Sequence, residues 1–270
     1  MVVASRVRCG AWLGVAWALG SLLGSAGAAR VSEFRSMDLE SVLKGELDGV
    51  GVAPDGAISP GPRPEVLFSG ETAFVWTVVS DGDGGVYAST GSEGALYRIR
   101  RDGSWDKVTQ TLEYELFSLV RGERGVLYVS GAPNGTISRV DPGGAVTTVV
   151  DLPEGLVWDL LVSPAGTLFA ATGESGEIYR ITSQGQTERI GRVPDAHVVS
   201  LTWWQDRLLC GTDGRGLLVT MDPENGSLEI LFDTNQEEVV AVLPLADGRL
   251  LFAANGKRQT PPPETGSGLV

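Results

Sequence analysis

Four side chains that could bind a ligand or an ion recur at a fixed spacing along this chain of 270 residues. Steps of 41 residues connect Thr77, Ser118, Asp159 and Ser200, and one further step reaches Ala241. If these positions occupy equivalent strands around a common axis, their hydroxyl and carboxyl groups face a common ligand or ion. Asp159 is the most interesting candidate, because it is the carboxylate of the set. The alternative is a hydrogen bond that each side chain makes within its own turn.

Large apolar residues precede three members of this polar row by one position. Trp76, Phe117 and Trp158 share the spacing of 41 residues and could form an aromatic platform for a ligand. We favour packing between repeats, because stacked repeats need one large residue at a fixed phase. Trp203 and Trp204 depart from the pattern, since one of two adjacent strand side chains must point away from the core. This pair is a second candidate binding surface, for a protein partner or a sugar.

Other reactive side chains stand alone in the sequence. His197 lies close to Asp195 but has no identifiable nucleophile or second metal ligand, which favours a structural or surface role. Asp81 and Asp83 resemble part of a calcium loop that lacks the following acidic ligand, so we favour a plain β-turn. Cys210 lies in an apolar run and is expected to be an inert, buried thiol. The sequence therefore identifies no catalytic residue, no metal and no cofactor.

The elements that must position these residues are short strands. Residues 156–182 contain the apolar runs Val157–Val162, 167–172 and Glu177–Ile181, separated by Pro-Ala-Gly and Gly-Glu-Ser-Gly, and a fourth run follows at 186–190. Runs rich in β-branched and aromatic residues between Gly and Pro predict a four-stranded antiparallel meander. One such sheet is too small to bury both of its faces, so it needs neighbours of the same kind.

The neighbouring copies are present in the sequence. A shift of 41 residues aligns the segments 72–110, 113–150, 155–190 and 196–232, and it places an incomplete copy with only two strands at 238–255. A period of about forty residues with four strands per repeat is typical of a β-propeller blade. The sequence thus predicts an all-β fold, a β-propeller of four-stranded blades.

The ends of the chain leave two arrangements open. Residues 49–59 are expected to form a strand or a tight hairpin, and residues 65–69 match the fourth strand of a blade. In one arrangement the outer strands from 49–69 complete the partial blade at 238–255 and close a ring of five blades. In the other, which we favour, the chain is a fragment of a larger ring. Residues 256–270 are expected to be a Pro-rich loop or a truncated end.

Residues 1–28 have the features of a signal peptide. Arg6 and Arg8 precede an apolar stretch at 11–23, and Ala-Gly-Ala at 26–28 supplies the small residues at which a signal peptidase cleaves. Residues 29–48 then link the leader to the blades. The formal net charge of −13 and the lack of clustered Lys and Arg argue against nucleic acids and anionic membranes as partners. We therefore expect an exported protein, periplasmic or extracellular, without membrane insertion after leader cleavage.

The repeats resemble those of secreted bacterial propellers of the NHL, YVTN and streptogramin-lyase-like kind. The resemblance rests on Gly-x-aliphatic-Tyr/Phe units at 85–91 and 166–173 and on Gly-x-Leu/Ile-Tyr-Arg-Ile units at 94–99 and 176–181. It covers about residues 65–255, without the Trp-Asp and Gly-His signatures of WD-type repeats. It implies a propeller fold. The lyases and lactonases on such scaffolds are expected to use His or clustered Asp, Asn and Glu around the channel, and this chain contains one His.

Two functions follow as hypotheses. The favoured one is a non-enzymatic, exported propeller that offers a rigid face for binding a protein or a polymer. The alternative is a metal-dependent hydrolase or lyase with its site at the mouth of the central channel, built around Asp159.

Overall fold

The computed structural model describes residues 2–5, 49–53, 57–61, 64–70, 72–182 and 184–256. Within these ranges the chain is built from β-strands, with a short 3-10 turn at Glu123–Gly125 and no α-helix, which confirms the all-β class. No helix among the described residues has the length and apolar character needed to cross a membrane. The chain divides into two compact units, Met1–Ser69 and Gly70–Val270.

The first unit contains two small antiparallel pairs. Strands β2 (Val50–Val52) and β3 (Ile58–Pro60) pair as a hairpin, one of the two alternatives expected for this segment. Strand β4 (Pro64–Phe68), also predicted, pairs with β1 (Val2–Ser5). β1 lies inside the predicted leader, whose other residues, like the linker 29–48 and the segment 257–270, lie outside the described part. The leader, the linker and the completion of the partial blade remain predictions.

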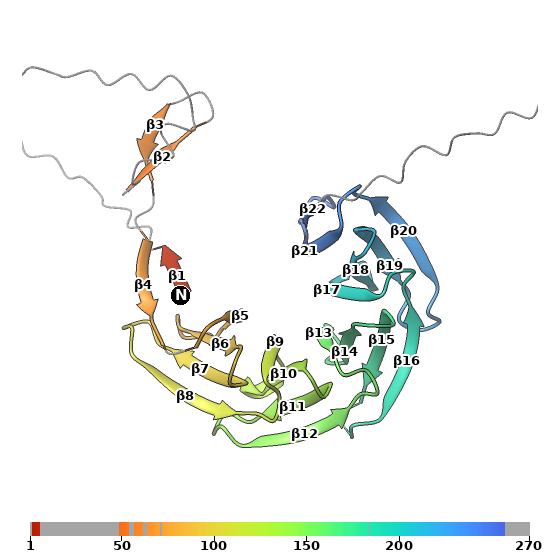
Figure 1. The fold of residues 1–270 in the computed structure, drawn as a ribbon, viewed down its shortest axis with the longest axis horizontal. Helices are drawn as coiled ribbons and strands as arrows, with labels where there is room; N and C mark the ends of the chain where they lie inside the picture. The colour runs from red at the N-terminus through yellow and green to blue at the C-terminus, as the bar shows by residue number, and fades with distance from the viewer. Residues whose placement is uncertain are drawn as a thin grey trace, which may run out of the picture. The chain divides into compact units, whose positions relative to one another are not determined.

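The second unit contains four antiparallel meanders of four strands in the order of propeller blades, and a bridge from β18 to β21 extends the sheet of the fourth to six strands (Figure 1). Blade 1 consists of β5 (Val75–Ser80), β6 (Val86–Thr90), β7 (Ala95–Ile99) and β8 (Trp105–Gln110). Blade 2 consists of β9 (Glu115–Arg121), β10 (Leu127–Ala132), β11 (Thr136–Val140) and β12 (Val146–Asp151). Blade 3 consists of β13 (Val157–Val162), β14 (Leu168–Thr172), β15 (Glu177–Ile181) and β16 (Thr187–Arg192). Blade 4 consists of β17 (His197–Trp204), β18 (Arg207–Asp213), β19 (Leu217–Met221) and β20 (Leu228–Asp233).

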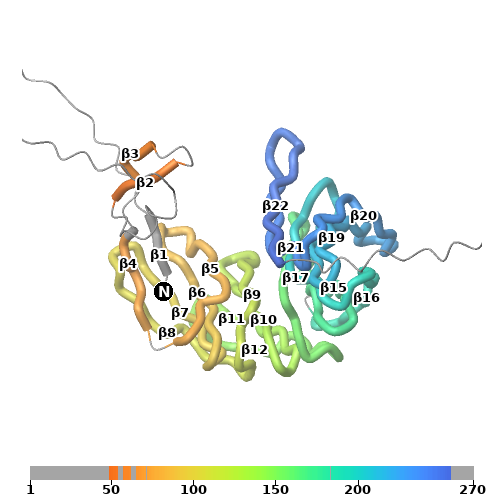
Figure 2. The backbone as a smooth tube through the Cα atoms, turned by 45° about the horizontal axis from the view of Figure 1, so that its top comes forward, coloured from red at the N-terminus to blue at the C-terminus, as the bar shows by residue number. Residues whose placement is uncertain are grey.

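The partial fifth copy is a hairpin of β21 (Glu238–Pro244) and β22 (Leu250–Asn255), which we call the terminal hairpin. In the second unit the first strand of each blade lies on the inner side of the row of blades and the fourth strand on the outer side (Figure 1). Consecutive first strands are in contact, from β5 through β9, β13 and β17 to β21. Figure 2 shows the same succession of blades from a second direction. The unit is therefore a β-propeller with four full blades.

Glycines between the second and third strands hold neighbouring blades close together. Gly94, Gly135, Gly176 and Gly216 all have positive φ, between 58° and 68°. A Cβ atom on any of them would overlap a backbone carbonyl oxygen at the start of the following copy, such as that of Glu113 beside Gly94. These positions therefore require glycine for both reasons, which explains the recurrent Gly before the third strand.

The core lies between the blades. At one register of the first strands, Leu119, Leu160 and Leu201 are only 1%, 2% and 5% exposed. The equivalent Val78 of blade 1 is 47% exposed. These leucines belong to three apolar clusters that contain residues of consecutive blades. Burial of such side chains is the main force that holds one blade to the next, because each sheet alone cannot cover its faces.

Candidate functional site

A β-bulge interrupts the first strand of each copy near its start. In blade 1 the ladder passes from Val75 opposite Thr90 to Thr77 opposite Ser89, which leaves Trp76 as the extra residue. The same irregularity makes Trp158, Val199 and Val240 the extra residues of the later copies. In blade 2, Leu116 and Phe117 together face Gly131. Bulges re-aim side chains and are frequent near binding sites.

The bulge residues Trp76, Phe117 and Trp158 form a continuous aromatic row. The ring centroids of Trp76 and Phe117 are 4.9 Å apart at an interplanar angle of 77°, and those of Phe117 and Trp158 are 4.7 Å apart at 35°. These are favourable contacts between aromatic rings. The interpretation as packing between repeats is consistent with these contacts. Trp76 is nevertheless 46% exposed, so part of the row also forms a surface.

The polar row at the next position links each blade to the next. The Thr77 hydroxyl donates to the Phe117 carbonyl oxygen at 2.7 Å. Ser118 Oγ donates to Asp159 Oδ1 at 2.9 Å. The Ser200 hydroxyl donates to the carbonyl oxygen of Val239 at 3.2 Å. These three side chains therefore bond to the neighbouring first strand, and not within their own turn as the alternative had it.

Asp159 joins three consecutive blades. Its Oδ1 accepts from Ser118 of blade 2 and from its own neighbour Leu160 N, and its Oδ2 accepts from Leu201 N of blade 4 at 2.8 Å. Burial of the carboxylate raises the pKa of Asp159 to about 6, although the hydrogen bonds from Leu201, Ser118 and Leu160 act in the opposite direction. A carboxylate tied to the scaffold in this way fixes the positions of the first strands.

A cavity of about 570 Å³ lies along these first strands. We call it the first-strand cavity. Its lining comprises Trp76, Thr77, Phe117, Trp158, Asp159, Val199, Ser200, Asp213, Glu238 and Val240. The structure thus brings together the aromatic row and three of the six predicted ligand-binding residues, Thr77, Asp159 and Ser200. Ser118 is buried beside Asp159 and does not line the cavity. Asp213 and Glu238 were not predicted.

Two of the four junctions between described copies share one hydrogen-bonding scheme. At the junction of blades 1 and 2, Trp76 Nε1 donates to Glu115 Oε2 at 2.6 Å. At the junction of blades 3 and 4, Trp158 Nε1 donates to His197 Nδ1 at 3.2 Å. Glu115 and His197 occupy the same register, two residues before the bulge. Each indole N–H therefore meets one acceptor on the next blade.

Glycine makes room for these two pairs. Gly91 and Gly173 lie opposite the position two residues before the bulge. A Cβ atom on Gly91 would overlap Glu115 Oε2, and one on Gly173 would come within 2.8 Å of His197 Nδ1. The junction of blades 2 and 3 has Ala132 at this place and needs no such room. At this junction Phe117 occupies the donor position and Leu156 occupies the acceptor position, so the donor and the acceptor are absent together.

The junction of blade 4 and the terminal hairpin breaks the scheme. The acceptor position holds Glu238, but the bulge residue is Val199, which has no side-chain donor. Asp213 takes the place of glycine, since it lies opposite His197 and also opposite Glu238. Neither carboxylate has a hydrogen-bond or ion-pair partner within the described ranges. This junction thus has two acceptors and lacks a donor.

Trp203 and Trp204 lie at the other end of β17 and do not join the cavity. β17 continues to Trp204 because Gln205 and Asp206, both with positive φ, form a two-residue hairpin turn. The ring of Trp203 packs against Phe169 of blade 3, with centroids 6.0 Å apart. Trp203 therefore fills space between blades 3 and 4, and the partly exposed Trp204 remains the half of the pair that could meet a partner.

The other singled-out side chains have structural contacts. His197 Nδ1 accepts N–H groups from Trp158 and from the backbone of Glu174, so the proton of the neutral ring is on Nε2. The Asp195 carboxylate forms its hydrogen bonds with residues other than His197. It accepts from the Thr212 hydroxyl at 2.5 Å and from Arg215 Nε at 2.7 Å.

The segment from Asp81 to Gly85 connects β5 and β6, and Asp81 N donates to the Gly85 carbonyl oxygen. The Asp81 carboxylate accepts from Asp83 N and Gly85 N and from the Arg98 guanidinium, at 2.8 to 3.2 Å. Burial acts to raise the pKa of Asp81, but these donors together hold it below the ordinary value. Cys210 is fully buried, as expected, and burial raises the pKa of its thiol to about 12. No group of three or more His, Cys, Asp or Glu in the described part of the chain could hold a metal ion.

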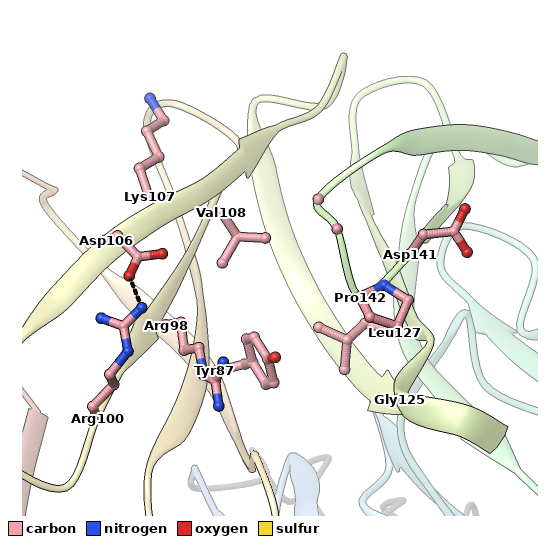
Figure 3. A pocket seen from close by; sticks show the side chains of 12 residues that line it. Tyr87, Arg98, Arg100, Asp106, Lys107, Val108, Gly125, Leu127, Asp141 and Pro142 are labelled. Carbon is pink, nitrogen blue, oxygen red and sulfur yellow. Dashed lines mark ion pairs between the residues drawn. The ribbon is translucent and has the colours of Figure 1, made fainter.

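Two further cavities lie between the outer parts of neighbouring blades, and most of their charged groups have partners. The one between blades 1 and 2 has a volume of about 260 Å³ (Figure 3). There Arg98 pairs with Asp81, Arg100 with Asp106 and Lys107 with Glu93. The equivalent cavity between blades 2 and 3, about 570 Å³, is lined by Arg139, which pairs with Asp141 at 2.6 Å. The first-strand cavity differs in having no Lys or Arg in its lining.

Solved structures share the fold of this chain at low sequence identity. Virginiamycin B lyase from Staphylococcus aureus is 16% identical, with a TM-score of 0.59 over 67% of this chain and 63% of the lyase. An extracellular domain from B. thetaiotaomicron is 16% identical, with a TM-score of 0.57 over 75% of this chain and 30% of that one. A chain of a nidogen/laminin complex is 14% identical, with a TM-score of 0.53 over 61% of this chain and 68% of that one.

The chain thus spans less than two thirds of the length of the S. aureus lyase. No protein-family model matches the sequence. No curated protein is similar to it. The predicted resemblance to streptogramin-lyase-like propellers is confirmed at the level of the fold, and the chain has the fold of a β-propeller.

Proposed function

We propose that this chain is an exported, non-enzymatic binding module whose first-strand cavity holds part of a protein or polymer ligand. The observation that carries this proposal is the lining of the cavity. Trp76, Phe117 and Trp158 offer a row of aromatic surface, and aromatic anchors in a concave site are typical of recognition. Bulges in adjacent, packed strands hold the row rigidly, which lowers the entropic cost of binding.

The polar groups of the cavity support binding more than catalysis. The Thr77 and Ser200 hydroxyls donate to carbonyl oxygens of the next copy, and the Asp159 carboxylate accepts from three donors. A nucleophile needs a base within hydrogen-bond reach, and none of these groups has such a partner in the cavity. The net charge of −13 weighs against a nucleic acid as the ligand. The export of the chain rests on the predicted leader, and extracellular proteins among those that share the fold agree with it.

A peptide library displayed on phage and selected against the purified chain tests the proposal. Peptides that depend on the cavity should lose binding to Trp76→Ala and keep it with Trp105→Ala. The two tryptophans are matched, since each is 46% exposed, but Trp105 lies on the outer strand of blade 1. Enrichment that is equally strong on both variants, or absent, would contradict a binding role for the cavity. A melting temperature raised by a divalent metal, with the rise abolished by Asp159→Asn, would instead favour the metal-dependent enzyme.

A further inference from the structure

We infer that the first-strand cavity recognises a cation that carries N–H donors, the side chain of a Lys or Arg residue on the ligand. This inference rests on the proposed function and names the chemistry of the ligand at the same site. It starts from the junction of blade 4 and the terminal hairpin, where two acceptors lack a donor.

The other junctions show what this position requires. Where an acceptor is present, at Glu115 or His197, the preceding blade supplies an indole N–H. Where the donor is replaced by Phe117, the acceptor is replaced by Leu156. At the last junction the acceptor Glu238 is kept and a second one, Asp213, is added, while the donor is replaced by Val199. Asp213 and Glu238 are partly exposed and have no donor within the described residues, so a ligand in the cavity can bring one.

The charge of the cavity specifies that donor further. Among the ten lining residues three are acidic and none is Lys, Arg or His. Asp159 is engaged by donors of the scaffold, which leaves Asp213 and Glu238. These two lie directly opposite each other on β18 and β21, where like charges repel. A cation between them relieves that repulsion and forms charge-assisted hydrogen bonds.

The aromatic row adds a second attraction for an organic cation. Trp76, Phe117 and Trp158 line the same cavity as the two carboxylates. The faces of aromatic rings attract ammonium and guanidinium groups, and the attraction is strongest for Trp. Because Trp76 donates its N–H to the Glu115 carboxylate at 2.6 Å, its ring is also more electron-rich than a free indole. A long basic side chain can lay its stem on this row and place its charged end between Asp213 and Glu238.

Other cations fit these features less well. A metal ion prefers three or more protein ligands, and no such group occurs among the residues that the structure describes. A quaternary ammonium would satisfy the rings but has no N–H for the acceptors. The chain's own Lys257 and Arg258 follow the terminal hairpin in the sequence, outside the described residues, so the experiment includes a variant without them.

The experiment uses a peptide from the phage selection whose binding depends on Trp76, measured by isothermal titration calorimetry. Replacing its Arg by citrulline, which has the same shape without the charge, should weaken binding at least tenfold. Asp213→Asn combined with Glu238→Gln should weaken binding of the Arg peptide by a similar factor. The matched control Asp206→Asn with Glu229→Gln removes two exposed charges elsewhere in blade 4 and should change binding less than twofold. Circular dichroism checks that each variant is folded.

The outcomes separate this inference from the proposed function. If a Trp76-dependent peptide binds the chain equally well in its citrulline form and its Arg form, the cation inference is wrong and the binding role of the cavity stands. If no peptide depends on Trp76, both are wrong. If Lys257→Gln with Arg258→Gln tightens binding of the Arg peptide at least tenfold, the chain's own cations compete for the cavity and recognition of an external cation is wrong. Equal binding with and without these two substitutions supports it.

Discussion

Two neighbouring junctions share the same backbone geometry but differ in their hydrogen bonds. One joins blades 3 and 4, and the other joins blade 4 and the terminal hairpin. In the first, the bulge residue Trp158 donates to His197, so the junction is satisfied by the chain itself. In the second, Val199 leaves Glu238 without that donor and Asp213 adds another carboxylate. Equivalent positions in the repeats thus show which acceptors have a donor within the chain. Glu238 and Asp213 have none among the described residues, and we assign that donor to the proposed ligand.

The largest expected effect comes from removing a bulge on which the comparison depends. Gly131 faces the bulge at Leu116 and Phe117, and a Cβ atom there would overlap the Glu115 carbonyl oxygen. Because backbone would have to move, Gly131→Ala should destabilise the chain by about 3 kcal/mol in urea unfolding.

Gly143→Ala is its control, since nothing lies within 4 Å of a Cβ at that position. It should change the free energy of unfolding by less than about 0.5 kcal/mol. Equal effects of the two substitutions would show that the bulge is not a fixed feature.

The next effect concerns the carboxylate that joins blades 2, 3 and 4. Because the pKa of Asp159 rises from 3.8 to about 6 on folding, the folded chain binds more protons than the unfolded chain between these values. This contribution to stability is present below about pH 4 and is lost as pH rises through 6, by at most about 3 kcal/mol. Asp159→Asn lacks it.

Urea unfolding at pH 4.5 and pH 7.5 measures this effect. The wild-type chain should lose stability relative to Asp159→Asn between the two values, because other titrating groups cancel in the comparison. A difference between the two proteins that does not change with pH would show that the Asp159 carboxylate is solvated.

A smaller effect tests whether the indole and its acceptor act as a pair. Trp158→Phe and His197→Leu together convert the junction of blades 3 and 4 into the apolar type of Phe117 and Leu156. A double-mutant cycle should give a coupling free energy of about 1 kcal/mol, since each single variant leaves one partner alone. Additive effects would mean that the hydrogen bond at 3.2 Å contributes nothing specific.

The smallest effect concerns the junction of blade 4 and the terminal hairpin, where two carboxylates lie opposite each other. Asp213→Asn should raise the free energy of unfolding by about 0.5 kcal/mol, because it removes the repulsion with Glu238 across β18 and β21. The gain should shrink in high salt. Asp206→Asn, at the opposite end of the same hairpin, should leave stability unchanged, and an equal gain there would point to net charge in place of the pair.

The strands could be predicted from the sequence because glycine and proline bound them clearly. Val157–Val162 and Glu177–Ile181 coincide with β13 and β15. The bulges could not be predicted, because first strands such as Val157–Val162 are apolar at most positions and show no alternation that an extra residue could interrupt. The polar row was found by its spacing, but its partners on the neighbouring blade are set by packing between copies, which no local pattern reveals.

The two unpaired carboxylates escaped prediction for different reasons. Glu238 shares the spacing of 41 residues with His197 and Glu115, and a count made two positions before the aromatic row finds it. Asp213 is hidden because the tight turn at Gln205 and Asp206 shortens the hairpin of blade 4 by one residue. A step of 41 from Gly173 therefore reaches Gly214 in place of Asp213.

The most direct test of the account follows the indole N–H resonances of Trp76 and Trp158 by NMR during titration with a capped arginine peptide. Both resonances should move while that of Trp105 does not. The movements should vanish when Asp213→Asn and Glu238→Gln are combined. Resonances that stay in place, or that move equally in that variant, would contradict it.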